Sequence, residues 1–297
     1  MPTDCTAANI NGRAIRCILF DIGDTLWTRI SDTTALQQLE EQASRRALDI
    51  LAQHLPPSTC PANDHALDKQ LYKAIGNELH RQKKRQPLRE PDMATIITAA
   101  LLQLGFPPID YTVGTILAEA LRIRNIQARA LFPDVPASLA ELRSRGFVLG
   151  IVTNRSYGGQ PFYEDLREFD LLDYFDYQHM AISADLGLRK PDPGIFLHAL
   201  NSLAIPPQKA AMVGDSLRAD VYGAHQLGML TIWKPRLVLR YRAAETGQQP
   251  LSKDHLFTYI QQHEQQWDYS PNDYVRPDLT IEHISDLLDI LAKAGPQ

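Results

Sequence analysis

Short apolar segments alternate with amphipathic segments through the second half of this sequence, and few folds are compatible with that order. Apolar runs of strand length occur at residues 147–152, 177–182, 210–213 and 230–233. Segments with helical periodicity occur at residues 134–145, 162–169 and 193–203 and in the stretch that ends at residue 227. A further apolar run, at residues 15–20, leads into an Asp-rich turn. Strands that alternate with helices in this way build parallel sheets with helices on both faces. The sequence therefore predicts an α/β fold with a doubly wound parallel sheet.

Two stretches interrupt the alternation. Residues 29–129 have no strand pattern, and apolar side chains recur there at helical spacing, as at Leu36, Leu39, Ala43 and Ala47. About four helices are expected in this insert, including one at 92–104 that Gly105 ends and one at 112–129. Residues 235–276 are rich in Gln, Arg and aromatic residues and precede a final amphipathic helix with Ile281, Ile284, Leu287, Leu288 and Leu291. The sequence thus predicts a core of residues 1–28 and 130–297, an inserted helical domain at 29–129, and a second insertion at 235–276.

Charge and cysteine content exclude several classes of function. The chain has 30 Lys and Arg against 35 Asp and Glu, a net charge of -5, which favours neither nucleic acid nor an anionic membrane as a partner. Cys5, Cys17 and Cys60 have neither a disulfide-framework pattern nor zinc-like spacing. Cys17 lies within the first predicted strand and is expected to be a small core residue. Without a targeting or membrane-spanning pattern, the expected location is the cytoplasm.

Residues that could carry chemistry lie at four places, after three of the predicted strands and in one later loop. Asp21, Gly23 and Asp24 come after the first strand, Thr153 and Asn154 after the second, Lys190 lies in a later loop, and Asp215 and Asp220 come after the strand at 210–213. The carboxyl ends of parallel strands meet at one edge of a sheet, so we expect these side chains around a single cleft. Several carboxylates in one cleft require a neutralising cation, and oxygen ligands favour a hard divalent ion such as Mg²⁺.

This arrangement resembles the haloacid dehalogenase-like (HAD) hydrolase superfamily. Its four motifs correspond here to FDIGDTL, VTN, Lys190 within RKPDPGIF, and VGDSLRAD, and the resemblance spans residues 15–233 and resumes in PDLTIEHISDLLDIL. Four motifs in the correct order at predicted strand ends are far more specific than any one of them. The resemblance implies a Rossmann-like core with an inserted cap domain, here residues 29–129. It also implies a phosphatase-type hydrolase acting on a small phosphorylated substrate.

The resemblance assigns a role to each matched residue. Asp21 would attack phosphorus and form an aspartyl-phosphate, which water then hydrolyses. Mg²⁺ would bind the Asp21 carboxylate, the Gly23 backbone carbonyl and the Asp215 carboxylate, with Asp220 supporting them. Thr153, Lys190 and Asn154 would contact the phosphoryl group or support the residues that do.

Gly23 departs from the phosphatase pattern. That position is usually a second Asp, which protonates the leaving group and then activates water. Asp24 is adjacent, but neighbouring side chains on extended backbone point to opposite sides, so it is a candidate acid and base rather than a direct replacement.

The sequence leaves two alternatives to phosphate-ester hydrolysis open. A haloacid dehalogenase would use the same nucleophile without metal, so the acids Asp215 and Asp220 argue against it. A binding or regulatory protein on the same scaffold is the other, and the retained Asp21 and Lys190 argue against it. Arg236, Arg240 and Arg242 are available to bind an anionic substrate, although solvated surface arginines are the simpler interpretation.

Overall fold

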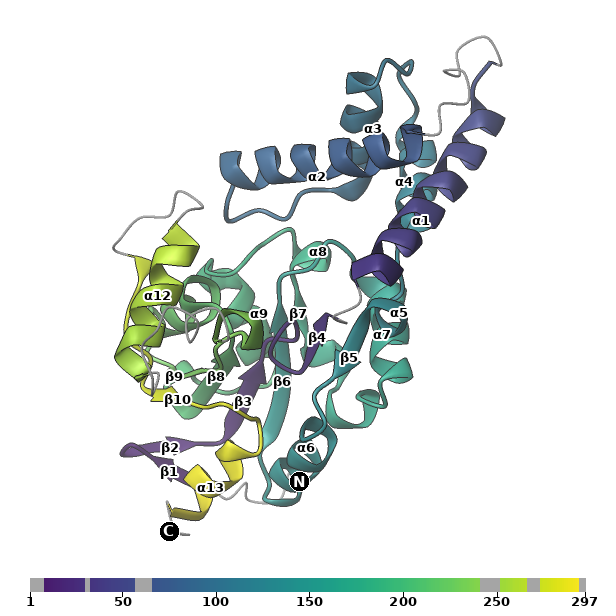
Figure 1. Ribbon diagram of the computed structural model, residues 1–297. Coiled ribbons are helices and arrows are strands. Elements are labelled where there is room, and N and C mark those ends of the chain that lie inside the picture. Colours follow the sequence, from purple (N-terminus) through teal and green to yellow (C-terminus); the bar gives the residue numbers. More distant parts are fainter. Residues whose placement is uncertain (1–7, 30–32, 57–65, 241–251, 266–272, 294–297) are drawn as a thin grey trace. The chain divides into compact units, whose positions relative to one another are not determined.

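The computed structural model describes residues 8–29, 33–56, 66–240, 252–265 and 273–293. The chain forms two compact units (Figure 1). The first consists of Met1–Thr28 and Ala130–Gln297, and the second, the helical unit, consists of Arg29–Arg129.

The first unit is built on a six-stranded sheet in which every pair of neighbouring strands is parallel. The strand order is β10-β9-β8-β3-β6-β7. The strands are β3 (Cys17–Phe20), β6 (Val148–Thr153), β7 (Ala181–Ile182), β8 (Ala210–Gly214), β9 (Leu230–Trp233) and β10 (Leu279–Thr280). This confirms the predicted α/β class with a parallel sheet.

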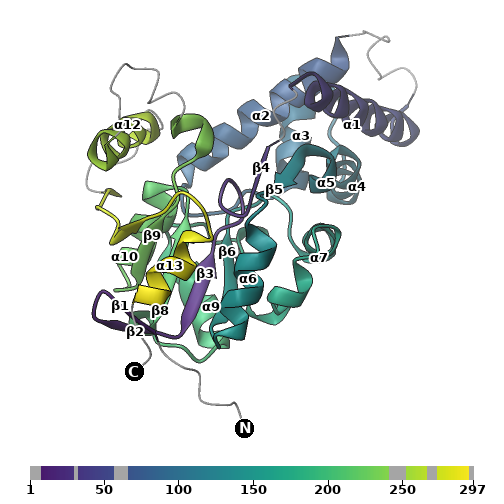
Figure 2. The ribbon, with the colours of Figure 1, turned by 60° about the horizontal axis from the view of Figure 1, so that its bottom comes forward.

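Side chains alternate between the two faces of each strand, and each face packs against its own helices. Ile18 and Phe20 belong to a cluster with residues of α6 (Val135–Ser144), α7 (Gly159–Glu168) and α13 (Asp286–Lys293). Cys17 and Leu19 belong to a second cluster with residues of α9 (Pro193–Ser202) and α10 (Gly223–His225). Figure 2 shows α6 and α13 side by side over the first of these faces. The sheet is therefore covered by helices on both sides, as predicted.

The thiol of Cys17 is fully buried in β3, and burial raises its pKa to about 12. Both observations agree with the predicted core role, because a thiol that stays protonated is a poor nucleophile.

The helical unit has its own hydrophobic core. Its helices are α1 (Thr33–His54), α2 (Leu67–Arg85), α3 (Met93–Gln103), α4 (Tyr111–Leu121) and the short α5 (Asn125–Ala128). Leu51, Leu71, Ile97 and Leu117 pack together at its centre. Asp92 caps α3 by accepting a hydrogen bond from the backbone N–H of Thr95.

Two predicted boundaries in the middle of the chain were wrong. The expected helix at 112–129 ends at Leu121, and residues Arg129–Leu131 instead form β5, which pairs with β4 (Trp27–Arg29). The expected strand at 177–182 is reduced to Ala181–Ile182. Before it, the Asp176 side chain accepts a hydrogen bond from Gln178 N and starts a 3₁₀ turn at Tyr177–His179.

Two more segments at the ends of the core differ from the prediction. Ile281 and Ile284 precede the final helix, which begins at Asp286. A hairpin of β1 (Ala8–Ile10) and β2 (Arg13–Ile15) precedes β3, and its two turn residues, Asn11 and Gly12, both have positive φ angles. An Asn-Gly turn of this kind is the usual two-residue connection between antiparallel strands.

Residues 235–276 lie only partly within the described ranges. They contain α12 (Lys253–Gln265), from which Leu256, Phe257 and Ile260 pack against Trp233 of β9 and residues of the π-helical segment η5 (Leu217–Tyr222). Nowhere in the described ranges is there a helix long and apolar enough to span a membrane.

Candidate active site

The site lies at the carboxyl ends of β3, β6 and β8. β3 pairs with β6 on one side and with β8 on the other, and Phe20 is in register with both Ile151 and Val213. The next residue, Asp21, donates its backbone N–H to Val213 O at 2.9 Å. The strands that follow β3 in the sequence lie on both sides of it in the sheet. In such sheets a crevice forms at the carboxyl end of the strand where the order reverses.

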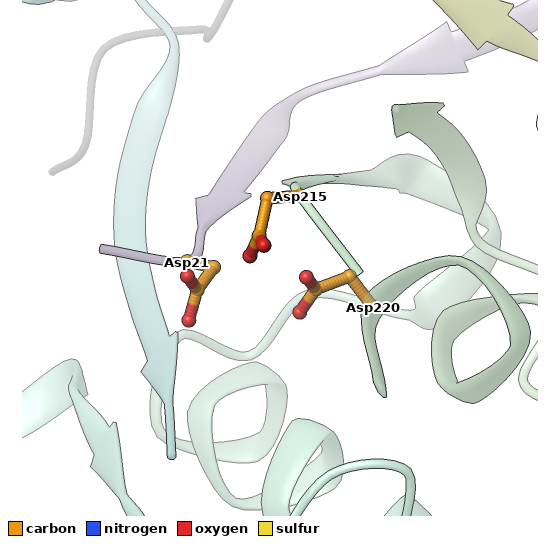
Figure 3. A group of neighbouring side chains, drawn as sticks. All are labelled: Asp21, Asp215 and Asp220. Atoms are coloured by element: carbon orange, nitrogen blue, oxygen red, sulfur yellow. The ribbon is translucent and has the colours of Figure 1, made fainter. Parts of the chain in front are cut away.

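Three buried carboxylates meet there. Asp21, Asp215 and Asp220 each offer an oxygen, and these atoms lie within 4.8 Å of one another. Figure 3 shows the three side chains facing a common space, two from strand ends and one from η5. All three are at most 6% exposed. Negative charges that are this close together and shielded from solvent repel one another strongly unless cations neutralise them.

Lys190 is the first of these cations. Its Nζ lies 2.6 Å from Asp21 Oδ1 and 2.6 Å from Asp220 Oδ1, and it donates to the backbone oxygen of Val152 at 2.7 Å. Burial lowers the pKa of this ammonium, but the two carboxylates more than offset burial, so the net shift is upward. Lys190 therefore stays charged beside Asp21.

Thr153 ends β6, one residue later than the predicted strand end, and Asn154 follows it. Asn154 Oδ1 accepts from the backbone N–H of Lys190 at 2.9 Å, and its Nδ2 donates to the Lys190 carbonyl at 3.1 Å. These two bonds fix the backbone of Lys190, so in this structure Asn154 positions Lys190. Thr153 is the last residue of β6 and is buried.

A tight turn brings Asp220 to the cluster. A Cβ added to Gly214 would clash with Asp220 Cγ, so only glycine fits at this position. Asp220 Oδ2 accepts from the backbone N–H of Ser216 at 3.0 Å, and Ser216 Oγ accepts from Ala219 N at 3.1 Å. Burial raises the pKa of the Asp220 carboxyl to about 7, although Lys190 partly opposes the shift.

Asp215 is held from both its backbone and its side chain. Trp233 Nε1 donates to its carbonyl oxygen at 2.9 Å, and Arg236 Nε contacts its carboxylate. Burial raises the pKa of Asp215, and Arg236 acts in the opposite direction without reversing the shift. The same ion pair raises the pKa of Arg236.

The loop after Asp21 turns back on itself. Asp24 has a φ of 56°, its backbone N–H bonds to Trp27 O at 2.6 Å, and its carboxylate accepts from Thr28 Oγ1 at 2.8 Å. A Cβ added to Gly23 would meet nothing within 4 Å, so the loop has room for a larger residue there. Asp24 Oδ2 also lies 3.9 Å from Arg236 Nε, so its carboxylate faces the Asp215 side of the site.

Two further residues support the site although no sequence motif marks them. Lys234 is buried, lies 3.7 Å from the Phe132 ring centroid and donates to the Asp24 carbonyl at 3.3 Å. Glu264 of α12 accepts from the backbone N–H groups of Leu217 and Arg218, both at 3.1 Å.

Arg236, a candidate from the sequence for binding an anionic substrate, has Asp215 as its partner in the structure. Of the other two arginines in that hypothesis, Arg240 pairs with Glu282 at 2.6 Å and Arg242 lies outside the described residues. Lys234 and Arg236 follow shortly after Trp233, the last residue of β9. This position at a strand end is the sequence signal that could have placed them at the site.

The donor set fits a hard divalent cation. Asp21, Asp215 and Asp220 together carry up to three negative charges, while Lys190 and Arg236 supply two positive ones. Carboxylate oxygens grouped in this way, with no thiolate or imidazole in the cluster, are the ligands that Mg²⁺ prefers.

Comparison with known proteins agrees with this geometry. The sequence model for haloacid dehalogenase-like hydrolases matches residues 15–228. A glyceraldehyde 3-phosphate phosphatase of Pyrococcus abyssi is 31% identical over 225 residues, which cover 74% of this chain and 81% of the relative.

Two solved structures have a similar fold. A HAD phosphatase from Thermococcus onnurineus matches with a TM-score of 0.54 at 24% identity, covering 93% of this chain and 98% of its own. A 2-haloacid dehalogenase from Pseudomonas syringae matches with a TM-score of 0.56 at 24% identity, and the match covers 95% of this chain and 100% of the dehalogenase chain. A phosphatase and a dehalogenase share this fold, so the fold alone does not decide the reaction.

Proposed function

The chain belongs to the haloacid dehalogenase-like hydrolases, and from this we propose that it hydrolyses the phosphate ester of a small metabolite with Asp21 as covalent nucleophile. The observation that carries the proposal is the cluster of Asp21 with Lys190, Asp215 and Asp220 at the ends of β3 and β8. The named relative from Pyrococcus abyssi, a phosphatase of a three-carbon sugar phosphate, supports the substrate class.

In the first step an oxygen of the Asp21 carboxylate attacks phosphorus and the bond from phosphorus to the leaving oxygen breaks, giving an aspartyl-phosphate. In the second step water attacks that phosphorus, inorganic phosphate leaves and the Asp21 carboxylate is regenerated. Lys190 offsets the charge of the attacking carboxylate and of the phosphoryl oxygens. In this proposal Thr153, buried at the end of β6, donates to a phosphoryl oxygen, and Asn154 keeps Lys190 in position.

The carboxylates of Asp21, Asp215 and Asp220, together with the Gly23 carbonyl, would hold Mg²⁺ in this proposal. When bound, Mg²⁺ supplies the positive charge that lets an anionic phosphoryl group approach three acids. The backbone N–H of Ser216 donates a hydrogen bond to Asp220 Oδ2 and thereby fixes the orientation of this carboxylate.

The helical unit is proposed to act as a cap that selects the substrate. It is inserted between the first and second motifs and has a separate hydrophobic core, so its surface can vary without disturbing the catalytic sheet.

Carbon–halogen cleavage by the same Asp21 is the second candidate, because a dehalogenase shares the fold. The buried Asp215 and Asp220 favour the phosphatase: a reaction without metal has no need to bring two further acids within 4.8 Å of the nucleophile.

The test measures phosphate release from an activated aryl phosphate by the purified protein with and without Mg²⁺. A parallel assay measures halide release from a 2-haloacid. We expect phosphate release that EDTA abolishes and no halide release. Phosphate release that is indifferent to EDTA would contradict the metal assignment, and halide release without phosphate release would replace the proposed reaction with the alternative.

A further inference from the structure

Arg236 is the cation that faces Asp215. Its Nε contacts the Asp215 carboxylate and lies 3.9 Å from Asp24 Oδ2. Lys190 neutralises Asp21 and Asp220, each at 2.6 Å, but no ion pair in the described part of the chain joins it to Asp215. Arg236 therefore balances the carboxylate that Lys190 does not reach.

The two side chains of this ion pair differ in their exposure to solvent. The Asp215 side chain is 6% exposed, and Trp233 Nε1 fixes its backbone carbonyl. The Arg236 side chain is 41% exposed. The guanidinium can therefore move into water at small cost, whereas the carboxylate has to remain in the site and needs a positive partner there.

A divalent cation in the carboxylate cluster would meet this guanidinium. Either the guanidinium leaves Asp215 and the ion pair is lost, or it stays and a positive charge remains within a few ångströms of the metal, where repulsion is strong because the surroundings are dry. Both arrangements weaken metal binding relative to a site without Arg236.

We propose that Arg236 is a built-in counter-ion that competes with the divalent cation for Asp215 and lowers the metal affinity of the site. The proposal rests on the metal site of the proposed function and adds a residue outside the matched family region, 15–228. Arg236 is thus a residue that sets the Mg²⁺ concentration at which the site fills, and it acts through Asp215.

Calorimetric titration of the metal-free protein with MgCl₂ tests this without measuring activity. Arg236→Gln should bind Mg²⁺ about ten- to a hundredfold more tightly than the wild type, the range in which groups around metal ligands alter affinity. Arg236→Lys keeps the charge and should stay within a few-fold of the wild type.

Arg240→Gln is the matched control. It removes the same charge from the same segment, but Arg240 pairs with Glu282, and among the described residues no ion pair joins it to the cluster. Its Mg²⁺ affinity should equal that of the wild type, and circular dichroism should show that each variant is folded. Arg236→Ala provides a second neutral variant with the same expected direction.

Unchanged or weaker Mg²⁺ binding in folded Arg236→Gln and Arg236→Ala overturns the competition, because a residue that only orients Asp215 would lower affinity when removed. Equal tightening in Arg240→Gln also overturns it, since a general charge effect would then suffice. Absence of Mg²⁺ binding in the wild type and in every variant removes the metal site itself, which is the distinct failure of the proposed function.

Discussion

At the scale of single residues, the proposed covalent mechanism depends on one oxygen of Asp21. Asp21→Asn should lower kcat by roughly a thousandfold to a millionfold, the range for loss of a covalent nucleophile, because an amide cannot attack phosphorus. The fold should remain, since Lys190 keeps Asp220 as an ion-pair partner. Single-turnover assays with an aryl phosphate measure the loss, and an unchanged circular dichroism spectrum is the control. Turnover near the wild-type rate would exclude Asp21 as the nucleophile.

Gly23 leads to a prediction about leaving groups. Without an acid at this position, the leaving oxygen departs as an anion, so aryl and acyl phosphates should be cleaved well and alkyl phosphates poorly. General acid and base help is worth about a hundredfold to ten-thousandfold, so its absence should give a steep dependence of rate on leaving-group pKa. The rate of the chemical step across a series of aryl and alkyl phosphates measures that slope. A shallow slope would instead point to another proton donor, with Asp24 the first candidate and Asp24→Asn its test.

Restoring the acid is the complementary experiment. Gly23→Asp adds a carboxyl group where an added Cβ meets nothing within 4 Å, and it leaves the backbone carbonyl in place. We expect alkyl phosphate hydrolysis to accelerate by up to about a hundredfold, the lower end of general acid catalysis, with little change for aryl phosphates. The ratio of the two rates is the measurement. No change in that ratio would show that an acid at position 23 cannot serve this loop.

At the scale of elements, Glu264 joins α12 to η5, because its carboxylate accepts hydrogen bonds from the backbone N–H groups of Leu217 and Arg218. Burial raises the pKa of this carboxyl to about 7 from its ordinary 4.5, and nearby Asp215 adds to the shift. The folded protein therefore binds this proton more tightly than the unfolded chain. The stabilisation is fully present below the ordinary pKa and is lost as the pH rises through about 7.

Glu264→Gln should remove this dependence while keeping one carbonyl oxygen for the two N–H groups. Between pH 5 and 7 the free energy of unfolding should fall less steeply with pH in the variant, by at most about 1.4 kcal/mol per pH unit. Asp220 has a similarly raised pKa and should leave a residual slope in both proteins. Urea unfolding at several pH values measures the difference. Parallel pH profiles would show that Glu264 does not titrate in this range.

At the scale of the whole molecule, the two units have separate cores, and every proposed metal ligand lies in the first. Mg²⁺ should stabilise that unit by mass action, about 2.7 kcal/mol at a hundredfold excess over Kd. Differential scanning calorimetry should show its transition rising with MgCl₂, while that of the helical unit stays in place. Asp215→Ala, which loses one of the proposed carboxylate ligands, is the control and should shift little. An equal shift in that variant would mean that the ions act elsewhere.

The sequence by itself determined the fold class, the family and the order of the motifs. Short-range patterns are enough for these, because a buried strand shows its apolar run and the residue after it shows its chemistry. Asp21, Asp215 and Lys190 are therefore recognisable from the sequence as strand-end or loop residues, and the parallel register of β3 with β8 then brings the two acids together.

Only the tertiary structure decided which partner each polar group has. Asn154, which the sequence led us to expect in contact with the phosphoryl group or in support of a residue that contacts it, hydrogen-bonds to the backbone of Lys190, 36 residues away. Arg236 was a candidate for substrate binding and contacts Asp215. Glu264, which belongs to none of the four motifs, accepts from the N–H groups of Leu217 and Arg218. Such choices depend on which charges become buried side by side, and burial is a property of the packed chain that spacing along the sequence does not encode.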